Sequence, residues 1–270
     1  MPATPPTRFS LSKILLIRAA KRLLWPHPSI YYPFGLARNR GSVFDKRNVD
    51  IYIEGYPRSG NTFSRIAFLS ANPGTHLQTH KHIPTFVLHL LKCRVPGMVL
   101  IRQPLDAAVS WAIHENRSLE EAAAYWNDYY SALLPARSEL LMAPFKEVTS
   151  DFGNMIKALN ARWGTSYVPF EHTPVNAARC FQLVEDRYRE VKGEVRESQV
   201  CRPSKVRRIV KETHLEHLEQ SNFLQDELGR ANEVYDMFVS QRSKDERRLT
   251  TRLVPQEVGE EARQAGATVI

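Results

Sequence analysis

The chain has 270 residues, of which 43% are hydrophobic and 24% are charged, and its formal net charge is +8. This length and composition are typical of a soluble globular protein with one main domain and peripheral additions. The basic balance favours an anionic partner, but it does not choose among a nucleotide, an acidic sugar, a membrane surface and a nucleic acid. The three cysteines form no C-x-x-C pair, so they predict neither a disulfide framework nor a cysteine zinc site and fit a reducing compartment.

The first 48 residues are expected to form an N-terminal extension. Residues 1–8 are rich in proline and predict disorder, whereas residues 10–25 predict an amphipathic basic helix, too short and too charged to span a bilayer. One side of this helix is apolar and the other is basic, which favours docking of the helix on the domain, with peripheral membrane contact as the alternative. The apolar side holds Leu16, Ile17, Ala20, Leu23 and Leu24, and the basic side holds Arg18, Lys21 and Arg22.

Strands and helices alternate after a turn-rich connection over residues 26–42. VDIYIEG (49–55) predicts a strand, and the segment from Gly60 predicts the helix that follows it. GMVLIR (97–102) reads as a strand buried on both faces, with Pro104 opening the next helix. Three further elements complete the expected alternation: a helix capped by Ser118 and Glu121, a strand over 139–148, and a helix over 151–164 that ends at Gly164.

This alternation predicts an α/β fold with a mainly parallel central sheet flanked by helices. Ligands of such sheets bind beyond the carboxyl ends of the strands. The loop over 55–62 and Arg102 both lie at such ends, so they are expected to face one crevice. Beyond residue 175 the chain becomes helical and highly charged: residues 202–220 predict a solvated helix, and residues 243–270 predict a charged, frayed tail.

The stretch EGYPRSGNTF (54–63) resembles a phosphate-binding loop in which Asn61 replaces the usual lysine. Backbone N–H groups of Ser59, Gly60, Asn61 and Thr62 are expected to converge on an oxyanion, with help from the dipole of the following helix. The cation stands three residues earlier, at Arg58, whose guanidinium can hold a terminal anionic group. A proline–glycine turn with a solvent-facing arginine is the alternative.

These residues resemble the sulfotransferases that use 3′-phosphoadenosine-5′-phosphosulfate (PAPS). PRSGNTF stands where the family has P-K-S-G-T-T-W, and IRQPLDAAVS supplies Arg102 and, eight residues later, Ser110, the spacing of the family's 3′-phosphate signature. HKHIP resembles the family's K-T-H-L-P stretch and makes His82 the match to its catalytic histidine. The likeness covers residues 49–164, and two ordered motifs with a histidine between them are more specific than either loop alone.

The resemblance implies a P-loop-NTPase-like sulfotransferase fold over residues 49–242 and transfer of a sulfuryl group from PAPS to an acceptor hydroxyl or amine, with the bisphosphate PAP as product. Under it His82 is the general base, with His80 as the alternative, and no metal is required. Arg58 would stabilise developing charge, and Phe63 would stack on adenine. The expected donor-binding residues are Arg58, Ser59, Gly60, Asn61, Thr62, Phe63, Arg102 and Ser110.

The sequence departs from the family in one segment. The R-K-G-x-x-G-D-W stretch that closes over the 3′-phosphate is absent after residue 165, and Arg202 or Lys205 is a candidate replacement. A nucleotide kinase or NTPase is one rival function, although the loop lacks its lysine and no acid ends the strand over 97–102; a non-catalytic anion-binding or membrane-binding protein on the same fold is another.

The acceptor and location follow less directly from the sequence. We expect a small-molecule or glycan acceptor, no nucleic-acid partner, and a cytoplasmic location with peripheral membrane contact through residues 10–25 as an addition. Aromatic side chains that could stack on the acceptor are Tyr31, Tyr32, Phe34 and Trp111. The histidines at 76, 80 and 82 also permit a zinc site, but no carboxylate or cysteine accompanies them within their segment.

Overall fold

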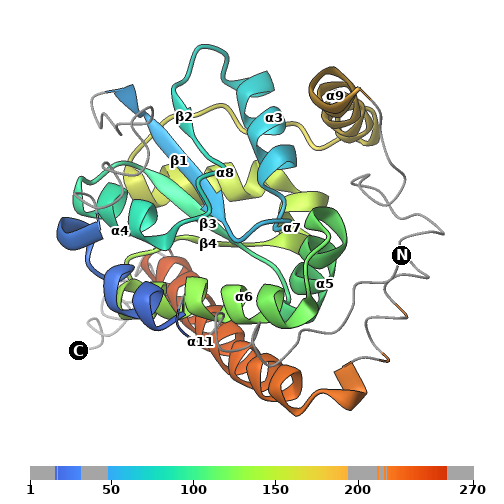
Figure 1. Cartoon of the computed structure of the whole chain (residues 1–270). Coiled ribbons are helices and arrows are strands. Elements are labelled where there is room, and N and C mark those ends of the chain that lie inside the picture. The colour runs from blue at the N-terminus through green and yellow to red at the C-terminus, as the bar shows by residue number, and fades with distance from the viewer. Residues whose placement is uncertain are drawn as a thin grey trace, which may run out of the picture.

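The computed structural model describes residues 16, 18–31, 48–193, 212, 216 and 218–253. Its centre is a four-stranded, wholly parallel sheet in the order β2-β1-β3-β4 (Figure 1). The α/β fold with a mainly parallel sheet is therefore confirmed. The strands are β1 (Ile51–Gly55), β2 (Leu77–Gln78), β3 (Gly97–Ile101) and β4 (Met142–Pro144).

Helices cover both faces of this sheet. One face is packed by α4 (Pro84–Lys92), α6 (Leu119–Leu133) and α11 (Asn222–Leu253), and α5 (Pro104–Glu115) packs on α6. The other face is packed by α3 (Asn61–Ala71), α7 (Phe145–Ser150), α8 (Phe152–Trp163) and α9 (Pro174–Lys192). Because both faces are buried, β1 and β3 are apolar throughout except at Glu54.

The predicted helix starts match the structure closely. Ser118 Oγ accepts a hydrogen bond from the Glu121 amide at the start of α6, and Asp151 caps α8 in the same way. Gly164 ends α8 in the left-handed conformation, with φ of 67°. Pro104 stands at the first turn of α5, as predicted.

The predicted strand over 139–148 is largely wrong. Pairing with β3 is confined to Met142–Pro144, and the chain turns directly into α7 at Phe145. Pro144 lacks an N–H and has φ of −62°, so it suits the residue before a helix better than the middle of a strand. This early turn brings Phe145 under the phosphate loop, where a Cβ on Gly60 would meet its ring at 3.4 Å.

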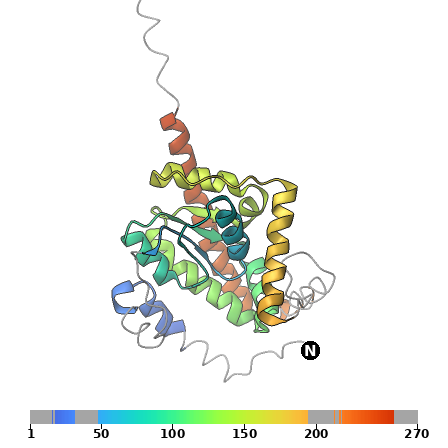
Figure 2. The ribbon, with the colours of Figure 1, turned by 90° about the horizontal axis from the view of Figure 1, so that it is seen from above.

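The helical, charged character predicted beyond residue 175 is present in α9 and α11. Figure 2 shows α9 standing beside α3 at one end of the molecule, with α11 crossing beneath the sheet. Helix α11 continues to Leu253, past the expected domain boundary at residue 243. The stretch with Arg202 and Lys205 lies outside the described residues, as do Tyr32 and Phe34. Among the described residues, none of the helices is both long and apolar enough to cross a membrane.

The N-terminal helix docks on the domain, but through the face opposite to the one expected. Its described helical residues are 16 and 18–24, and Arg18 is 6% exposed whereas Leu16 and Leu23 are 73% and 72% exposed. The apolar side was expected to pack inward because amphipathic helices usually bury that side. The inversion has an electrostatic cause: Arg18 binds the buried carboxylates of Asp128 in α6 and Glu227 in α11.

Candidate active site

The phosphate-like loop joins β1 to α3 at the carboxyl edge of the sheet. Gly60 precedes the first helical residue with φ of 99°, and no side chain caps the helix start. A first turn without a side-chain cap leaves its N–H groups directed at the loop, an arrangement that binds anions. Gly55 is equally constrained, because a Cβ there would lie 2.5 Å from the carbonyl oxygen of Leu100 in β3.

Asn61 stands where phosphate-binding loops usually have a lysine, and it is buried and stabilises the loop. Its Nδ2 donates to the Tyr56 carbonyl at 3.0 Å, and the Ser59 amide donates to the same oxygen at 3.2 Å. The Ser59 side chain is fully buried. The expectation that the Ser59 N–H points at an oxyanion is therefore wrong for this structure, since a hydrogen bond inside the turn occupies it. The amides of Gly60, Asn61 and Thr62 remain the candidate cradle.

The two arginines expected to share a crevice are in direct contact. Arg102 follows β3, and its Nη1 donates to the carbonyl oxygen of Arg58 at 3.1 Å. Arg58 Nε donates to Ser110 Oγ in α5 at 3.3 Å. Parallel pairing of β1 with β3 produces this meeting, because their carboxyl ends lie side by side. Arg58 lies 44 residues from Arg102 and 52 residues from Ser110 in sequence, yet the three side chains form one basic cluster.

Arg102 is further oriented by an aromatic ring. Its guanidinium lies 4.3 Å from the centre of the Phe145 ring, within the range of a cation–π contact. Phe145 is also the residue beneath Gly60, so one side chain supports both the loop and the second arginine. The early start of α7 thereby contributes to the site, although nothing in the sequence pattern indicated it.

His82 is held in one orientation by hydrogen bonds from several elements. Its Nδ1 lies 2.7 Å from the carbonyl oxygen of Gly55, and the hydroxyl of Tyr125 in α6 donates to the His82 carbonyl at 2.6 Å. A carbonyl oxygen only accepts, so Nδ1 carries the proton and Nε2 of the neutral ring is left as the acceptor. Burial lowers the pKa of His82, although the bond to Gly55 opposes this effect. The ring is therefore neutral at pH 7, with a basic Nε2.

His80 is more exposed and contacts the loop rather than the sheet. Its Nε2 lies 3.1 Å from Thr62 Oγ in the first turn of α3, and its ring centre lies 5.7 Å from that of His82. His80, His82 and Arg58 all have positive φ, at 64°, 55° and 65°. Non-glycine residues seldom adopt this conformation, and such strain concentrates at functional sites.

Glu54 is a buried acid beside the site, and the sequence motifs did not indicate a role for it. It is 0% exposed, and its two carboxylate oxygens accept the backbone N–H groups of Lys81 and His82 at 2.9 and 3.3 Å. Burial raises its pKa to about 7, despite the opposing effect of these two bonds. Through these two hydrogen bonds Glu54 holds the backbone of residues 81 and 82 in place. The sequence signal was an acidic residue inside an otherwise apolar strand, which requires a buried partner.

Phe63 lies in the core of the face that α8 and α9 cover. It is 5% exposed, and its ring packs against Phe152, Phe170, His172 and Phe181 at centroid distances of 5.3–6.5 Å. Stacking of Phe63 on adenine stays a prediction, and it would require one of these neighbours to move. Phe181 in α9 is the nearest ring in the set.

A cluster of aromatic rings surrounds Tyr125 in α6, the residue that binds the His82 carbonyl. Trp111 stacks on Tyr125 at 5.0 Å with an interplanar angle of 27°, and both rings lie 5.6 Å from Tyr56. Trp111 was one of the aromatic residues that could stack on an acceptor, and the structure places it beside Tyr125, whose hydroxyl binds the His82 carbonyl. Tyr31, the other described aromatic of that expectation, packs against the same core.

Zinc binding was the less favoured alternative for the histidines at 76, 80 and 82. In the described part of the chain, no three histidine, cysteine, aspartate or glutamate side chains gather in a way that could hold a metal ion. His80 and His82 instead contact Thr62 and Gly55.

Comparisons with known proteins give one distant match. No protein-family model and no curated protein matches the chain. Among solved structures it matches the crystal structure of mouse sulfotransferase SULT7A1 complexed with PAP, with 15% sequence identity and a TM-score of 0.37. The match covers 68% of this chain and 90% of that chain. A TM-score this low establishes no common function, so the residues of the site have to support one by themselves.

Proposed function

We propose that the chain is a sulfotransferase that moves a sulfuryl group from PAPS to an acceptor hydroxyl or amine. The observation that carries this proposal is the meeting of Arg58, Arg102 and Ser110 beside an uncapped helix start, with a neutral, oriented histidine at the same edge of the sheet. This arrangement supplies the cations for a nucleotide with phosphates at both ends, together with a base for the acceptor.

The donor would be bound from two sides. The N–H groups of Gly60, Asn61 and Thr62, with the helix dipole, suit the 5′-phosphosulfate. Arg102 and Ser110, which follow β3, suit the 3′-phosphate, because guanidinium and hydroxyl groups both donate to phosphate oxygens. Arg58 belongs to the loop itself and contacts Arg102 and Ser110, and it would stabilise the charge that develops on the leaving phosphate.

His82 is the better candidate for the base. In the proposed step the acceptor oxygen bonds to sulfur while the bond from sulfur to the bridging oxygen breaks, and Nε2 of His82 takes the acceptor proton. A base needs a free acceptor nitrogen near neutral pH, and the Gly55 contact with the lowered pKa provides it. We assign His80, whose Nε2 contacts Thr62 in the first turn of α3, the role of a donor to the transferred group.

The kinase or NTPase alternative fits the site less well. Those enzymes use a loop lysine and an acidic ligand for magnesium. Here Asn61 braces the turn through the Tyr56 carbonyl, and the acid nearest the loop, Glu54, accepts the two backbone N–H groups of residues 81 and 82. A sulfuryl group carries less negative charge than a phosphoryl group, so basic side chains without a metal suit it.

Transfer of labelled sulfate from PAPS to a panel of acceptors tests this function. We expect turnover by the natural chain and a loss of about 10²–10⁴-fold in His82→Ala with PAP binding retained, which is the usual contribution of a general base. His76→Ala, an exposed histidine before β2, is the matched control and should keep full activity. ATP hydrolysis without sulfate transfer would favour the kinase alternative. PAP binding with no turnover in any variant would favour a non-catalytic protein.

A further inference from the structure

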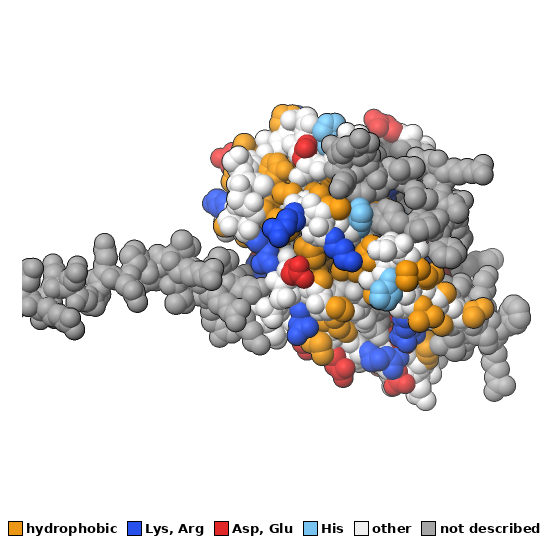
Figure 3. Space-filling model, turned by 90° about the vertical axis from the view of Figure 1, so that its left-hand side faces the viewer, with side chains coloured by type: hydrophobic (Ala, Val, Ile, Leu, Met, Phe, Trp, Pro, Cys, Tyr) orange, Lys and Arg blue, Asp and Glu red, His pale blue; other side chains and the backbone are white. Residues whose placement is uncertain are grey.

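The N-terminal helix exposes an apolar stripe to solvent. Leu16, Leu23 and Ile30 are 73%, 72% and 48% exposed, and Ala19, Ala20 and His27 are exposed between them. The spacing of 16, 19, 20 and 23 keeps these residues on one side of the helix, and His27 and Ile30 stand exposed in the turn and the helical turn over 28–31 that follow it. Figure 3 shows hydrophobic side chains beside Lys and Arg side chains on the side of the molecule that carries this helix.

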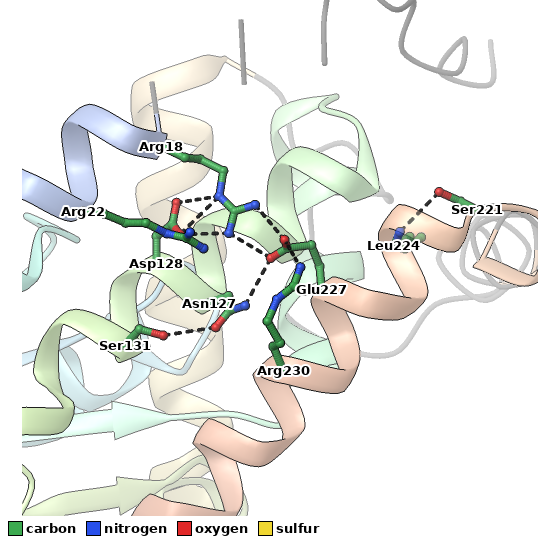
Figure 4. A network of polar contacts seen from close by, with 9 residues as sticks. All are labelled: Arg18, Arg22, Asn127, Asp128, Ser131, Ser221, Leu224, Glu227 and Arg230. Atoms are coloured by element: carbon green, nitrogen blue, oxygen red, sulfur yellow. Dashed lines mark hydrogen bonds and ion pairs between the residues drawn. The ribbon is translucent and has the colours of Figure 1, made fainter. Parts of the chain in front are cut away.

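A buried ionic cluster holds the helix in this orientation (Figure 4). Arg18 Nη1 lies 2.6 Å from Glu227, and Arg18 Nη2 lies 3.0 Å from Asp128, with all three side chains 7% exposed or less. Burial alone would raise the pKa of Glu227, but hydrogen bonds from Arg18 and Asn127 outweigh it and lower that pKa. Arg22, whose side chain is 58% exposed, also reaches Asp128. The domain thus binds the polar side of the helix and leaves Leu16 and Leu23 in solvent.

This choice of face is unusual energetically. Removing charges from water carries a large desolvation penalty that pairing only partly offsets, whereas burying leucines would be favourable. A helix that only needed to pack would turn its apolar side inward. The observed orientation is the one expected of a helix whose apolar side meets a second hydrophobic phase.

The charge of the chain is concentrated in the same segment. Residues 1–48 contain nine Lys or Arg and one Asp, a net charge of +8. The other 222 residues contain 28 basic and 28 acidic residues, so their net charge is zero. An amphipathic helix with exposed leucines and a basic surrounding sequence is complementary to a membrane surface that carries anionic headgroups.

We propose that the stripe formed by Leu16, Ala19, Ala20, Leu23 and Ile30 docks on an anionic lipid bilayer. Docking does not depend on the proposed sulfotransferase activity, although it would place the candidate site close to the lipid. The Trp25 carbonyl accepts the Thr85 hydroxyl at 2.8 Å, and the Trp25 ring lies 5.5 Å from Tyr125, whose hydroxyl binds the His82 carbonyl. The helix is therefore packed directly against the segments that carry the histidine.

Sedimentation of the full chain with lipid vesicles tests the docking. We expect binding to vesicles of equal parts phosphatidylglycerol and phosphatidylcholine, little binding to phosphatidylcholine alone, and release at about 1 M NaCl, where the Debye length is ~3 Å. The double variant Leu16→Glu with Leu23→Glu should bind at least about tenfold more weakly, because both leucines lose their apolar contact. Leu183→Glu, on an exposed position of α9, is the matched control and should bind as the natural chain does.

Two further readouts keep the result decisive. Leu23→Trp should show a blue shift in fluorescence only when anionic vesicles are added. Circular dichroism should show the same thermal midpoint for the glutamate variant and the natural chain, since both leucines stand in solvent. Equal binding by the glutamate variant and the natural chain would overturn the proposal. So would a change from dimer to monomer in that variant without lipid, which would assign the stripe to a second copy of the chain.

Discussion

Replacing Glu54 by glutamine should change how stability depends on pH. The carboxyl group is 0% exposed, and burial raises its pKa from the ordinary 4.5 to about 7. Between these two values the native state retains the proton that the unfolded chain has released. The free energy of unfolding therefore falls as pH rises through this window, and this contribution is lost by the time the pH exceeds about 7.

The size of the effect follows from the pKa values. One pKa unit corresponds to about 1.4 kcal/mol, so the change from 4.5 to about 7 amounts to about 3 kcal/mol. Glu54→Gln removes the titrating group and should flatten the curve by this amount. At low pH the variant should be about 1 kcal/mol less stable, because its amide nitrogen cannot accept one of the two N–H groups of residues 81 and 82.

Urea denaturation at several pH values between 4.5 and 8 measures this difference. Glu139→Gln, an exposed carboxylate at the opposite edge of the sheet, is the control and should keep the slope of the natural chain. Parallel curves for the natural chain and Glu54→Gln would refute the reasoning, because Glu54 would then titrate alike in the folded and unfolded states.

Three further changes test other parts of the structure. Gly55→Ala should cost about 1–3 kcal/mol in urea denaturation, because its Cβ would lie 2.5 Å from the Leu100 carbonyl oxygen, whereas Gly229→Ala in α11 meets no atom within 4 Å and should cost nothing. Arg18→Met should cost about 3 kcal/mol by removing the buried cation between Asp128 and Glu227, which would keep only Arg22 and Arg230 as their respective basic partners, and a loss below 1 kcal/mol would contradict the ionic cluster. The acid limb of kcat/KM should have its midpoint below the ordinary 6.5 of histidine, because burial lowers the pKa of His82, and a midpoint above 6.5 would exclude this ring as the base.

The sequence predicted those parts of the fold that local pattern and turn chemistry determine. β-Branched and aromatic residues identified β1, a continuous apolar run identified β3, and the predicted cap Ser118 stands where α6 begins. The contact between Arg58 and Arg102 followed from a topological rule, since parallel neighbouring strands bring their carboxyl ends together. The roles of these residues in binding and catalysis stay predictions.

The parts that could not be predicted depend on distant partners. The face that the N-terminal helix buries is decided by Asp128 and Glu227, which lie 110 and 209 residues from Arg18 in sequence. Asn61 stabilises the loop through its hydrogen bond to the Tyr56 carbonyl, and this contact depends on the geometry of the turn, which the residue types alone do not reveal. Glu54 could have been found, because a lone acid in an apolar strand signals a buried polar partner. The long helix α11 could also have been found, because Leu224, Leu228, Ala231 and Phe238 recur at helical spacing.

Calorimetric titration with PAP tests the central claim most directly, because it measures donor binding without requiring the acceptor. We predict one site per chain, and a loss of about 2–5 kcal/mol in binding free energy for Arg102→Ala, as expected when a charge-assisted contact to phosphate is removed. Arg137→Ala, an exposed arginine that precedes β4 at the opposite edge of the sheet, should bind as the natural chain does. No heat of binding in the natural chain, or equal affinity in Arg102→Ala, would contradict the account.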